Sequence, residues 1–99
     1  MISQVQIKMA NVIVTFKVNL ESPETNVEDV KDAVSVKIED SGVQVGKTEV
    51  EEVAFGLKAI NFVCIMDEDK GSTDRLEETM KEVGGVNSVQ VVDVRRAIG

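Results

Sequence analysis

The chain is short and acidic: its 99 residues include 18 acidic and 11 basic side chains, giving a net charge of −7, and its three aromatic residues are all phenylalanine. A chain of this length closes one apolar core, so we expect a single domain over residues 1–99 with a mainly aliphatic interior. Direct binding of nucleic acid is disfavoured, because the negative charge would repel a phosphate backbone and there is no Trp or Tyr to stack on bases.

The first regular element is predicted at Asn11–Leu20, after an irregular lead-in over residues 1–10. Apolar and polar residues alternate along it with the period of two that is typical of a half-buried strand. Glu21, Ser22 and Pro23 end the strand, because proline lacks the backbone donor of a sheet ladder and restricts the residue before it. The positions expected to face the core are Val12, Val14, Phe16 and Val18.

A helix is expected next, ending at Ser41 and Gly42. Its N-cap candidates are Thr25, which would form a capping box with Glu28, and Asn26. The many valines lower its intrinsic helix propensity, so packing against a sheet must stabilise it. Apolar residues recur at helical spacing at Val27, Val30, Ala33, Val34 and Ile38.

Two strands of different character follow this helix. Residues 43–50 form a weaker strand, interrupted by Gly46 and bordered by Glu51 and Glu52, which is typical of a sheet edge protected by charge. Residues 57–66 are apolar at both alternating sets of positions. This pattern predicts an interior strand, or one whose outer face meets a partner.

A second helix and a last strand complete the predicted elements. After a polar turn at residues 67–71, Thr73 caps a helix that ends at the glycine pair 84–85. Residues 86–94 are rich in valine and predict the last strand, with a short tail after it. The apolar stripe of the helix is Leu76, Met80 and Val83.

The predicted order of elements is β-α-β-β-α-β, an α+β pattern. The two β-α-β halves of this order pack two helices on one face of a four-stranded antiparallel sheet, which is the ferredoxin-like arrangement. The other face of the sheet is then open to solvent or to a partner. This architecture supports many unrelated functions, so the fold alone assigns none.

The sequence offers little for catalysis. It has no histidine, no CxxC pair and no glycine-rich phosphate loop, and Cys64 lies in an apolar run that fits a core position. The acidic residues Asp67, Glu68, Asp69 and Asp74 fit a solvated loop better than a cation site, because they lack the spacing of a calcium loop. We therefore expect neither an enzyme nor a metal or cofactor.

The location of the protein is predicted from its cysteine and its apolar runs. A lone cysteine excludes an internal disulfide and is typical of a reducing compartment, so we expect a cytoplasmic protein. There is no apolar run of about 18 residues that could span a membrane, and no secretion signal is recognised.

Three surface features remain as candidates for binding. Phe55 lies at a turn beside acidic residues, where it is either a projecting side chain or a plug at the edge of the core. Arg95 and Arg96, expected in the tail, are either a binding pair or a solubilising end. The apolar strand 57–66 is either an interaction surface or the centre of the sheet.

The motifs together resemble the nucleotide-exchange domain of translation elongation factor 1-beta in its archaeal form. They are VAFGLKAINFVCIMDEDKGSTDRLEE at residues 53–78, VTFKVNLESPE at 14–24 and VNSVQVVDVRR at 86–96. The resemblance implies a ferredoxin-like domain that exchanges guanine nucleotide on elongation factor 1-alpha, the GTPase that delivers aminoacyl-tRNA. It also implies a factor that can act as a monomer.

The resemblance also implies which residues bind the partner. Phe55, followed by Gly56 and Lys58, matches the family aromatic that packs into the GTPase near its nucleotide-binding region. Arg96 matches the position of a lysine that, in eukaryotic members, reaches toward the magnesium site. Here arginine replaces lysine, and its forked guanidinium differs from a compact ammonium, so Arg95 could share or take this role.

Two other functions occur on ferredoxin-like folds. A ferredoxin-like regulatory or assembly module would pair into a dimer and bind a small molecule between its copies. An acylphosphatase-like enzyme would need an arginine in a phosphate-binding loop after the first strand. That place holds the acidic residues Glu21 and Glu24, which would repel a phosphate, so the enzyme ranks last.

Overall fold

The structure, a computed structural model, describes residues 11–67 and 73–96. The lead-in at 1–10, most of the polar turn at 67–71 and the tail after Arg96 lie outside the described residues. The elements are β2 (Asn11–Leu20), α1 (Val27–Asp40), β3 (Gln44–Glu52), a short 3-10 turn η1 (Ala54–Gly56), β4 (Lys58–Asp67), α2 (Thr73–Lys81) and β5 (Val86–Arg96). Their order confirms the predicted β-α-β-β-α-β pattern.

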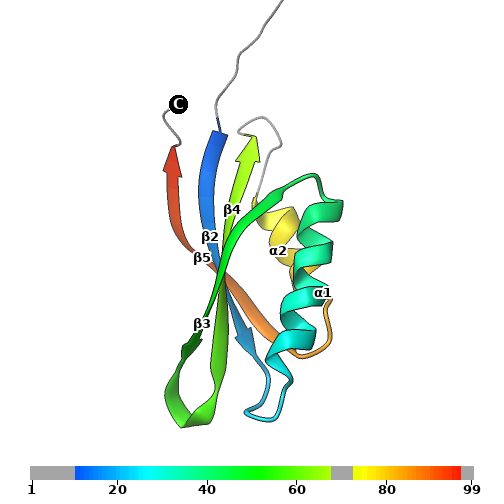
Figure 1. The fold of residues 1–99 in the computed structure, drawn as a ribbon, viewed down its shortest axis with the longest axis vertical. Coiled ribbons are helices and arrows are strands. Elements are labelled where there is room, and N and C mark those ends of the chain that lie inside the picture. The colour runs from blue at the N-terminus through cyan, green and yellow to red at the C-terminus, as the bar shows by residue number, and fades with distance from the viewer. Residues whose placement is uncertain (1–10, 68–72, 97–99) are drawn as a thin grey trace, which may run out of the picture.

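The four strands form one antiparallel sheet in the order β3-β4-β2-β5, and both helices lie on the same side of it (Figure 1). The ferredoxin-like prediction is therefore confirmed. β2 and β4 are the two interior strands, as the apolar pattern of residues 57–66 predicted. β3 is an edge strand, and its ladder with β4 shifts register between Val45 and Lys47, so Gly46 sits in a bulge that suits an edge.

The core lies between the sheet and the helices. Alternate residues of β2 and β4 point into it, and in β2 the inward set is the predicted one. The helices contribute most of their predicted stripes, but Ala33 is exposed, so its place in the stripe of α1 is wrong. α2 ends at Lys81 and not at the glycine pair 84–85, so Val83 is buried just after the helix. The main members of the core are Val14, Phe16, Val18, Leu20, Val30, Val34, Ile38, Ile60, Phe62, Cys64, Met66, Leu76 and Met80.

The start of α1 distinguishes the two N-cap candidates. Asn26 is the N-cap, and its side-chain oxygen accepts a hydrogen bond from the backbone N–H of Asp29 at 3.0 Å. A capping box between Thr25 and Glu28 would need the helix to begin one residue earlier, so that prediction is wrong. The helix ends as predicted, with Ser41 as its C-cap and Gly42 at a φ of 84°.

The last strand is longer than the sequence indicated. β5 continues to Arg96, whereas the prediction ended it at Val94 and placed both arginines in a tail. The physical reason is that β2 extends back to Asn11 and offers partners for them. Arg95 lies opposite Ile13 and Arg96 opposite Val12, so both backbones belong to the antiparallel ladder.

Candidate functional site: two ends of one sheet

The hairpin between β3 and β4 ends in a turn that presents Phe55 to solvent. The backbone N–H of Val53 donates to the carbonyl of Leu57 at 2.9 Å, and the N–H of Leu57 donates to the carbonyl of Ala54 at 3.2 Å. These bonds close the turn, with Phe55 at a φ of 64° and Gly56 at 77°. Glycine at the second position makes the left-handed backbone accessible there without a side-chain clash.

Phe55 is 93% exposed, so the alternative of a plug at the edge of the core is wrong. Its left-handed backbone costs about 1–2 kcal/mol for a residue other than glycine. Its side chain also gains little of the free energy that burying a phenylalanine supplies. Neither feature stabilises the fold. An exposed aromatic in a strained turn is a pattern of binding sites, where strain holds a side chain in place for a partner.

Two other predicted residues lie beside Phe55 at the hairpin end. Gly56 completes the turn, and Lys58 opens β4, where it is half-buried and pairs in the ladder with Glu52 of β3. Opposite charges at facing positions of an antiparallel pair support its register. The structure therefore brings Phe55, Gly56 and Lys58 together, as their closeness in the sequence suggested.

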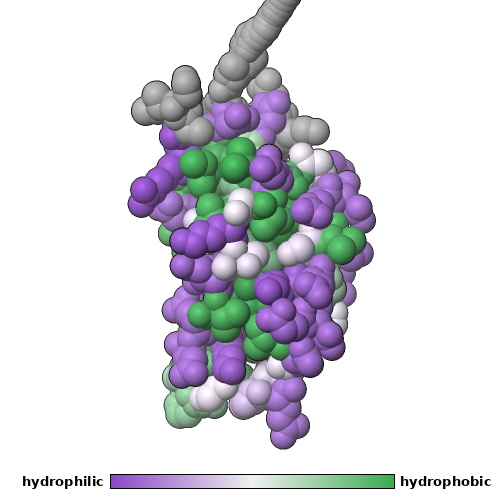
Figure 2. All heavy atoms as spheres, viewed as in Figure 1, coloured by the Kyte–Doolittle hydropathy of each residue, from purple (hydrophilic) through white to green (hydrophobic). Residues whose placement is uncertain are grey.

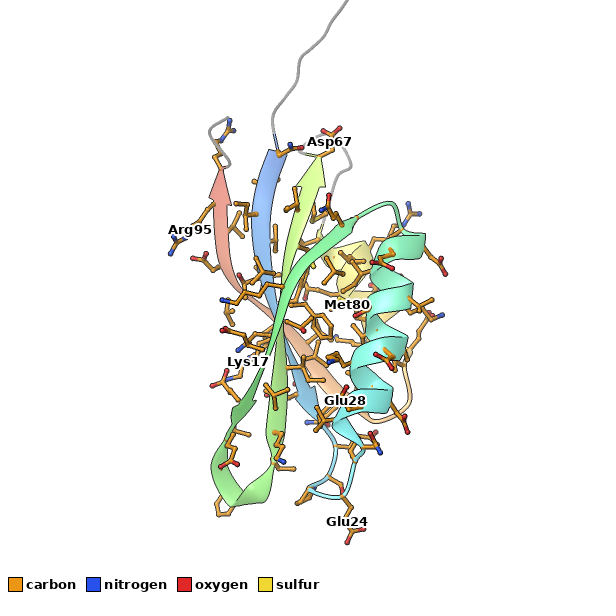
Figure 3. The ribbon with its side chains drawn as sticks, in the orientation of Figure 1. Lys17, Glu24, Glu28, Asp67, Met80 and Arg95 are labelled. Atoms are coloured by element: carbon orange, nitrogen blue, oxygen red, sulfur yellow. The ribbon has the colours of Figure 1, made fainter. Side chains whose placement is uncertain are left out.

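The two arginines lie at the other end of the sheet and on opposite faces of β5. Arg95 faces the side without helices, and its Nε donates to Oδ2 of Asp93 at 2.9 Å (Figure 3). Arg96 is the next residue, so it points to the opposite face, beyond the part that the helices cover. Both side chains are exposed. A pocket of the partner that covers one face of β5 can therefore bind only one of the two arginine side chains.

The structure does not bring Phe55 and the arginines together. Arg96 pairs with Val12 at the start of β2. Lys58 is level with Leu20 at the end of β2, and the Phe55 turn lies beyond Lys58. Eight residue steps of about 3.3 Å separate those two positions of β2, or about 26 Å. Figure 1 shows the hairpin tip and the end of β5 at opposite ends of the sheet.

The helix-free face of the sheet changes character between these ends. Near the hairpin, Glu51 accepts a hydrogen bond from Nδ2 of Asn61 at 2.8 Å and lies 3.7 Å from Nζ of Lys17. Toward the end of β5 the same face carries the half-buried Ile13 and Ile65, which pair with each other. Figure 2 shows apolar side chains over the strands in both halves of the molecule, with paler ones at the hairpin tip.

Some surface residues were not found from the sequence. Val92 is 52% exposed because a register shift in the pairing of β5 with β2 leaves it opposite no residue of β2. Nothing in a valine-rich segment marks that shift. The sequence marks Pro23 only as the end of a strand, but in the structure it lies next to the Phe55 turn. A proline in the sequence predicts a turn but not which other loop lies beside that turn.

Cys64 has the core role that the sequence suggested. Its side chain is fully buried, its Sγ lies 3.9 Å from the carbonyl oxygen of Phe62, and burial raises its pKa from 9.0 to about 12. A thiol with such a pKa stays protonated at neutral pH and is a poor nucleophile.

The predictions on a metal site and on a membrane span can be compared with the structure only over the residues that it describes. Within residues 11–67 and 73–96, no three acidic or cysteine side chains are grouped so that they could hold a metal ion. Glu68 and Asp69 of the acidic loop lie outside the described residues. No helix in the described part of the chain is long and apolar enough to cross a membrane.

Comparison with known proteins gives a consistent family. Residues 13–97 match the model of the EF-1 guanine nucleotide exchange domain. Elongation factor 1-beta of Methanothermobacter thermautotrophicus is 35% identical over 88 residues, which cover 89% of this chain and 98% of that protein. Elongation factor 1-beta of Methanocaldococcus jannaschii is 36% identical over 89 residues, covering 90% of this chain and 100% of that protein.

Solved structures with low identity support the fold alone. The ACT domain from GTP pyrophosphokinase of Chlorobium tepidum superposes with a TM-score of 0.59 at 14% identity, covering 83% of this chain and 99% of that one. The C-terminal domain of MgtC from Mycobacterium tuberculosis has the same TM-score at 10% identity, with 94% of each chain covered.

Proposed function

The chain belongs to the family of EF-1 guanine nucleotide exchange domains, and we propose that it releases nucleotide from elongation factor 1-alpha by contacting that GTPase with both ends of its sheet. The observation that carries the two-ended contact is the exposed, strained Phe55 about 26 Å from the arginine pair. One bound nucleotide is too small to touch both groups. The hairpin end and the β5 end therefore contact different parts of the GTPase.

The hairpin end serves as the anchor. Large aromatic side chains that enter a partner's pocket dominate the affinity of many interfaces. Phe55 is already exposed and fixed by its turn, so little further ordering is needed when it binds. Gly56 permits the turn and Lys58 borders it. This end sets how tightly the two proteins associate.

The β5 end drives exchange. A GTPase holds its nucleotide largely through a magnesium ion and the phosphate groups that the ion bridges. A guanidinium brought into that region competes with the magnesium for phosphate oxygens, which it can bind in a forked geometry. We assign this role to Arg96, which corresponds to the basic position near the end of the family's domain. Arg95 lies on the other face of β5.

Exchange in this scheme involves no covalent chemistry. The factor binds the nucleotide-free GTPase more tightly than the loaded one, and coupling is reciprocal, so it weakens GDP binding by the same factor by which GDP weakens its own binding. Both GDP and GTP are released faster, and the nucleotide in excess rebinds. The net charge of −7 favours association with a basic surface of the GTPase.

The test is release of a fluorescent GDP analogue from elongation factor 1-alpha of the same organism, under excess unlabelled GTP. We expect substoichiometric amounts of this protein to accelerate release of the whole bound population, because one molecule acts repeatedly. Heat-unfolded protein at the same concentration is the control for nonspecific effects. Absence of acceleration with folded protein and a GTPase that binds GDP would contradict the proposal.

A further inference from the structure

We propose that the turn between β2 and α1, residues 22–25, is a second part of the anchor: Pro23 supports the Phe55 turn, and Glu24 pairs with a basic side chain of the GTPase. The inference rests on the proposed function. It adds a second loop to the proposed interface, makes Pro23 a positioning residue, and specifies the chemistry of the GTPase surface that binds both loops. That surface is an apolar pocket with lysine or arginine at its rim.

The two turns lie side by side although they are far apart in the sequence. A Cβ added to Gly56 would lie 3.8 Å from both Cβ and Cγ of Pro23, at van der Waals distance. The proline ring therefore lies next to the backbone that follows Phe55, with room for about one methyl group between them. Figure 1 shows the loop after β2 beside the hairpin tip. A change in the first turn alters the support of the second.

The turn at residues 22–25 is as well fixed as the hairpin turn. The backbone N–H of Thr25 donates to the carbonyl of Ser22 at 3.1 Å, and the N–H of Glu24 donates to the hydroxyl of Ser22 at 3.0 Å. Pro23 occupies the second position of this turn, where its fixed φ is favoured. Just before it, Glu21 donates its N–H to the carbonyl of Gly85 at 2.9 Å. Two preorganised turns lose little entropy when they bind together.

Charge indicates the chemistry of the partner. Pro23 and Glu24 are both exposed, and Figure 3 shows Glu24 pointing away from the body of the protein at the hairpin end. Exposed Glu21 lies at the start of the same loop, and Glu52 lies at the end of β3. The exposed aromatic is thus flanked by carboxylates. Such an arrangement matches an apolar pocket with a cationic rim, in which the rim charges steer association.

The first experiment reverses one charge. Glu24→Lys is compared with Glu78→Lys, an equal change at an exposed position of α2. The association rate constant with GDP-loaded elongation factor 1-alpha is measured by stopped-flow fluorescence at low and high salt. We expect Glu24→Lys to slow association about 10-fold at low salt, with a smaller effect at high salt, since rim charges act mainly on the association rate. Glu78→Lys should slow association much less.

The outcomes separate the inference from the function on which it rests. If the wild-type protein accelerates GDP release and both lysine variants associate at the same rate, the inference is wrong and the proposed function stands. If the wild-type protein neither binds the GTPase nor accelerates release, both fall. The maximal release rate at saturation should be equal for Glu78→Lys and wild type, because α2 belongs to neither end of the sheet.

The second experiment tests whether Pro23 acts through Phe55. Pro23→Ala removes the ring that lies next to the Gly56 backbone, and we expect it to raise the dissociation constant of the complex about 3- to 10-fold. In the Phe55→Ala background the same change should have an effect of less than about 2-fold, because there is no aromatic left to position. Equal effects of Pro23→Ala in both backgrounds would exclude the positioning role, provided that thermal unfolding shows each variant to be folded.

Discussion

The hairpin end and the β5 end of the sheet differ in the properties that decide what a surface can bind. The hairpin end consists of two tight turns that present an exposed aromatic among carboxylates. The β5 end consists of strand pairing that continues, past a register shift at Val92, to the last described residue and carries two arginines on opposite faces. One end offers apolar contact area at little entropic cost, and the other offers positive charge.

β2 and β4 connect these ends directly. Both strands are interior, and their inward side chains form much of the core, so the distance between the ends is held by the best-packed part of the molecule. A rigid spacer lets binding at one end position the other end without a moving part. Substitutions at the hairpin end should therefore change affinity, and substitutions at the β5 end should change the rate of exchange.

The largest expected effect is on the rate of exchange. Arg96→Ala should lower the maximal rate of GDP release at saturating factor by about 100-fold, the usual consequence of removing one group that stabilises a charged transition state. Arg75→Ala, at an exposed position of α2, is the matched control and should retain the wild-type rate. If Arg95→Ala and not Arg96→Ala lowers the rate, the roles of the two arginines are reversed.

Phe55→Ala should act on affinity. Loss of a central aromatic anchor weakens an interface by about 2 kcal/mol, or about 30-fold in the dissociation constant. Isothermal titration with nucleotide-free elongation factor 1-alpha measures this constant. Val36→Ala removes another exposed apolar side chain, on α1 away from the hairpin, and should leave it unchanged. An unchanged constant for Phe55→Ala would remove the hairpin end from the interface.

The strain at Phe55 predicts a smaller effect on stability. Phe55→Gly relieves the left-handed backbone, and after the greater flexibility of unfolded glycine is subtracted, the gain should be about 0.5–1 kcal/mol. Chemical denaturation measures the free energy of unfolding. Ala54→Gly in the same turn, whose φ is not positive, should lower stability by a similar amount. A loss of stability in Phe55→Gly would mean that the side chain contributes to the fold.

The buried Cys64 should add no pH dependence to the stability of the protein near neutral pH. Burial raises its folded-state pKa from 9.0 to about 12, so its contribution to stability is fully present below pH 9 and is lost as pH rises from there through 12. Cys64→Ser removes this dependence. The difference in unfolding free energy between the two proteins should be constant from pH 6 to 8 and should change only in that alkaline range. A thiol reagent should react quickly at pH 8 only after unfolding.

The fold followed from the sequence because its signals are local. Alternation in β2 and β4, the apolar stripes of the helices and the glycine at position 42 each act over a few residues, and all agree with one arrangement. The errors lie where partners from distant parts of the chain decide. The end of β5 depended on the register in which it pairs with β2, which places Arg95 and Arg96 opposite Ile13 and Val12. The choice of N-cap is a local exception, because two adjacent residues had side chains suited to it.

The candidate site was predictable in its residues but not in its layout. Phe55 stood out as a large apolar residue at an acidic turn, and Arg95 and Arg96 as a basic pair in an acidic chain. Their separation depends on which strands pair and in which register, which no short pattern encodes. Gly56 and Pro23 also belong to two loops that only the folded chain brings side by side.

A double-mutant cycle on Phe55→Ala and Arg96→Ala tests most directly whether the two ends act separately. The quantity measured is the second-order rate constant for GDP release at low factor concentration. Sites about 26 Å apart on a rigid sheet should act independently, so the loss in the double variant should equal the product of the two single losses within about 2-fold. A double variant no slower than the slower single variant would show that both residues serve one site, contrary to the two-ended contact.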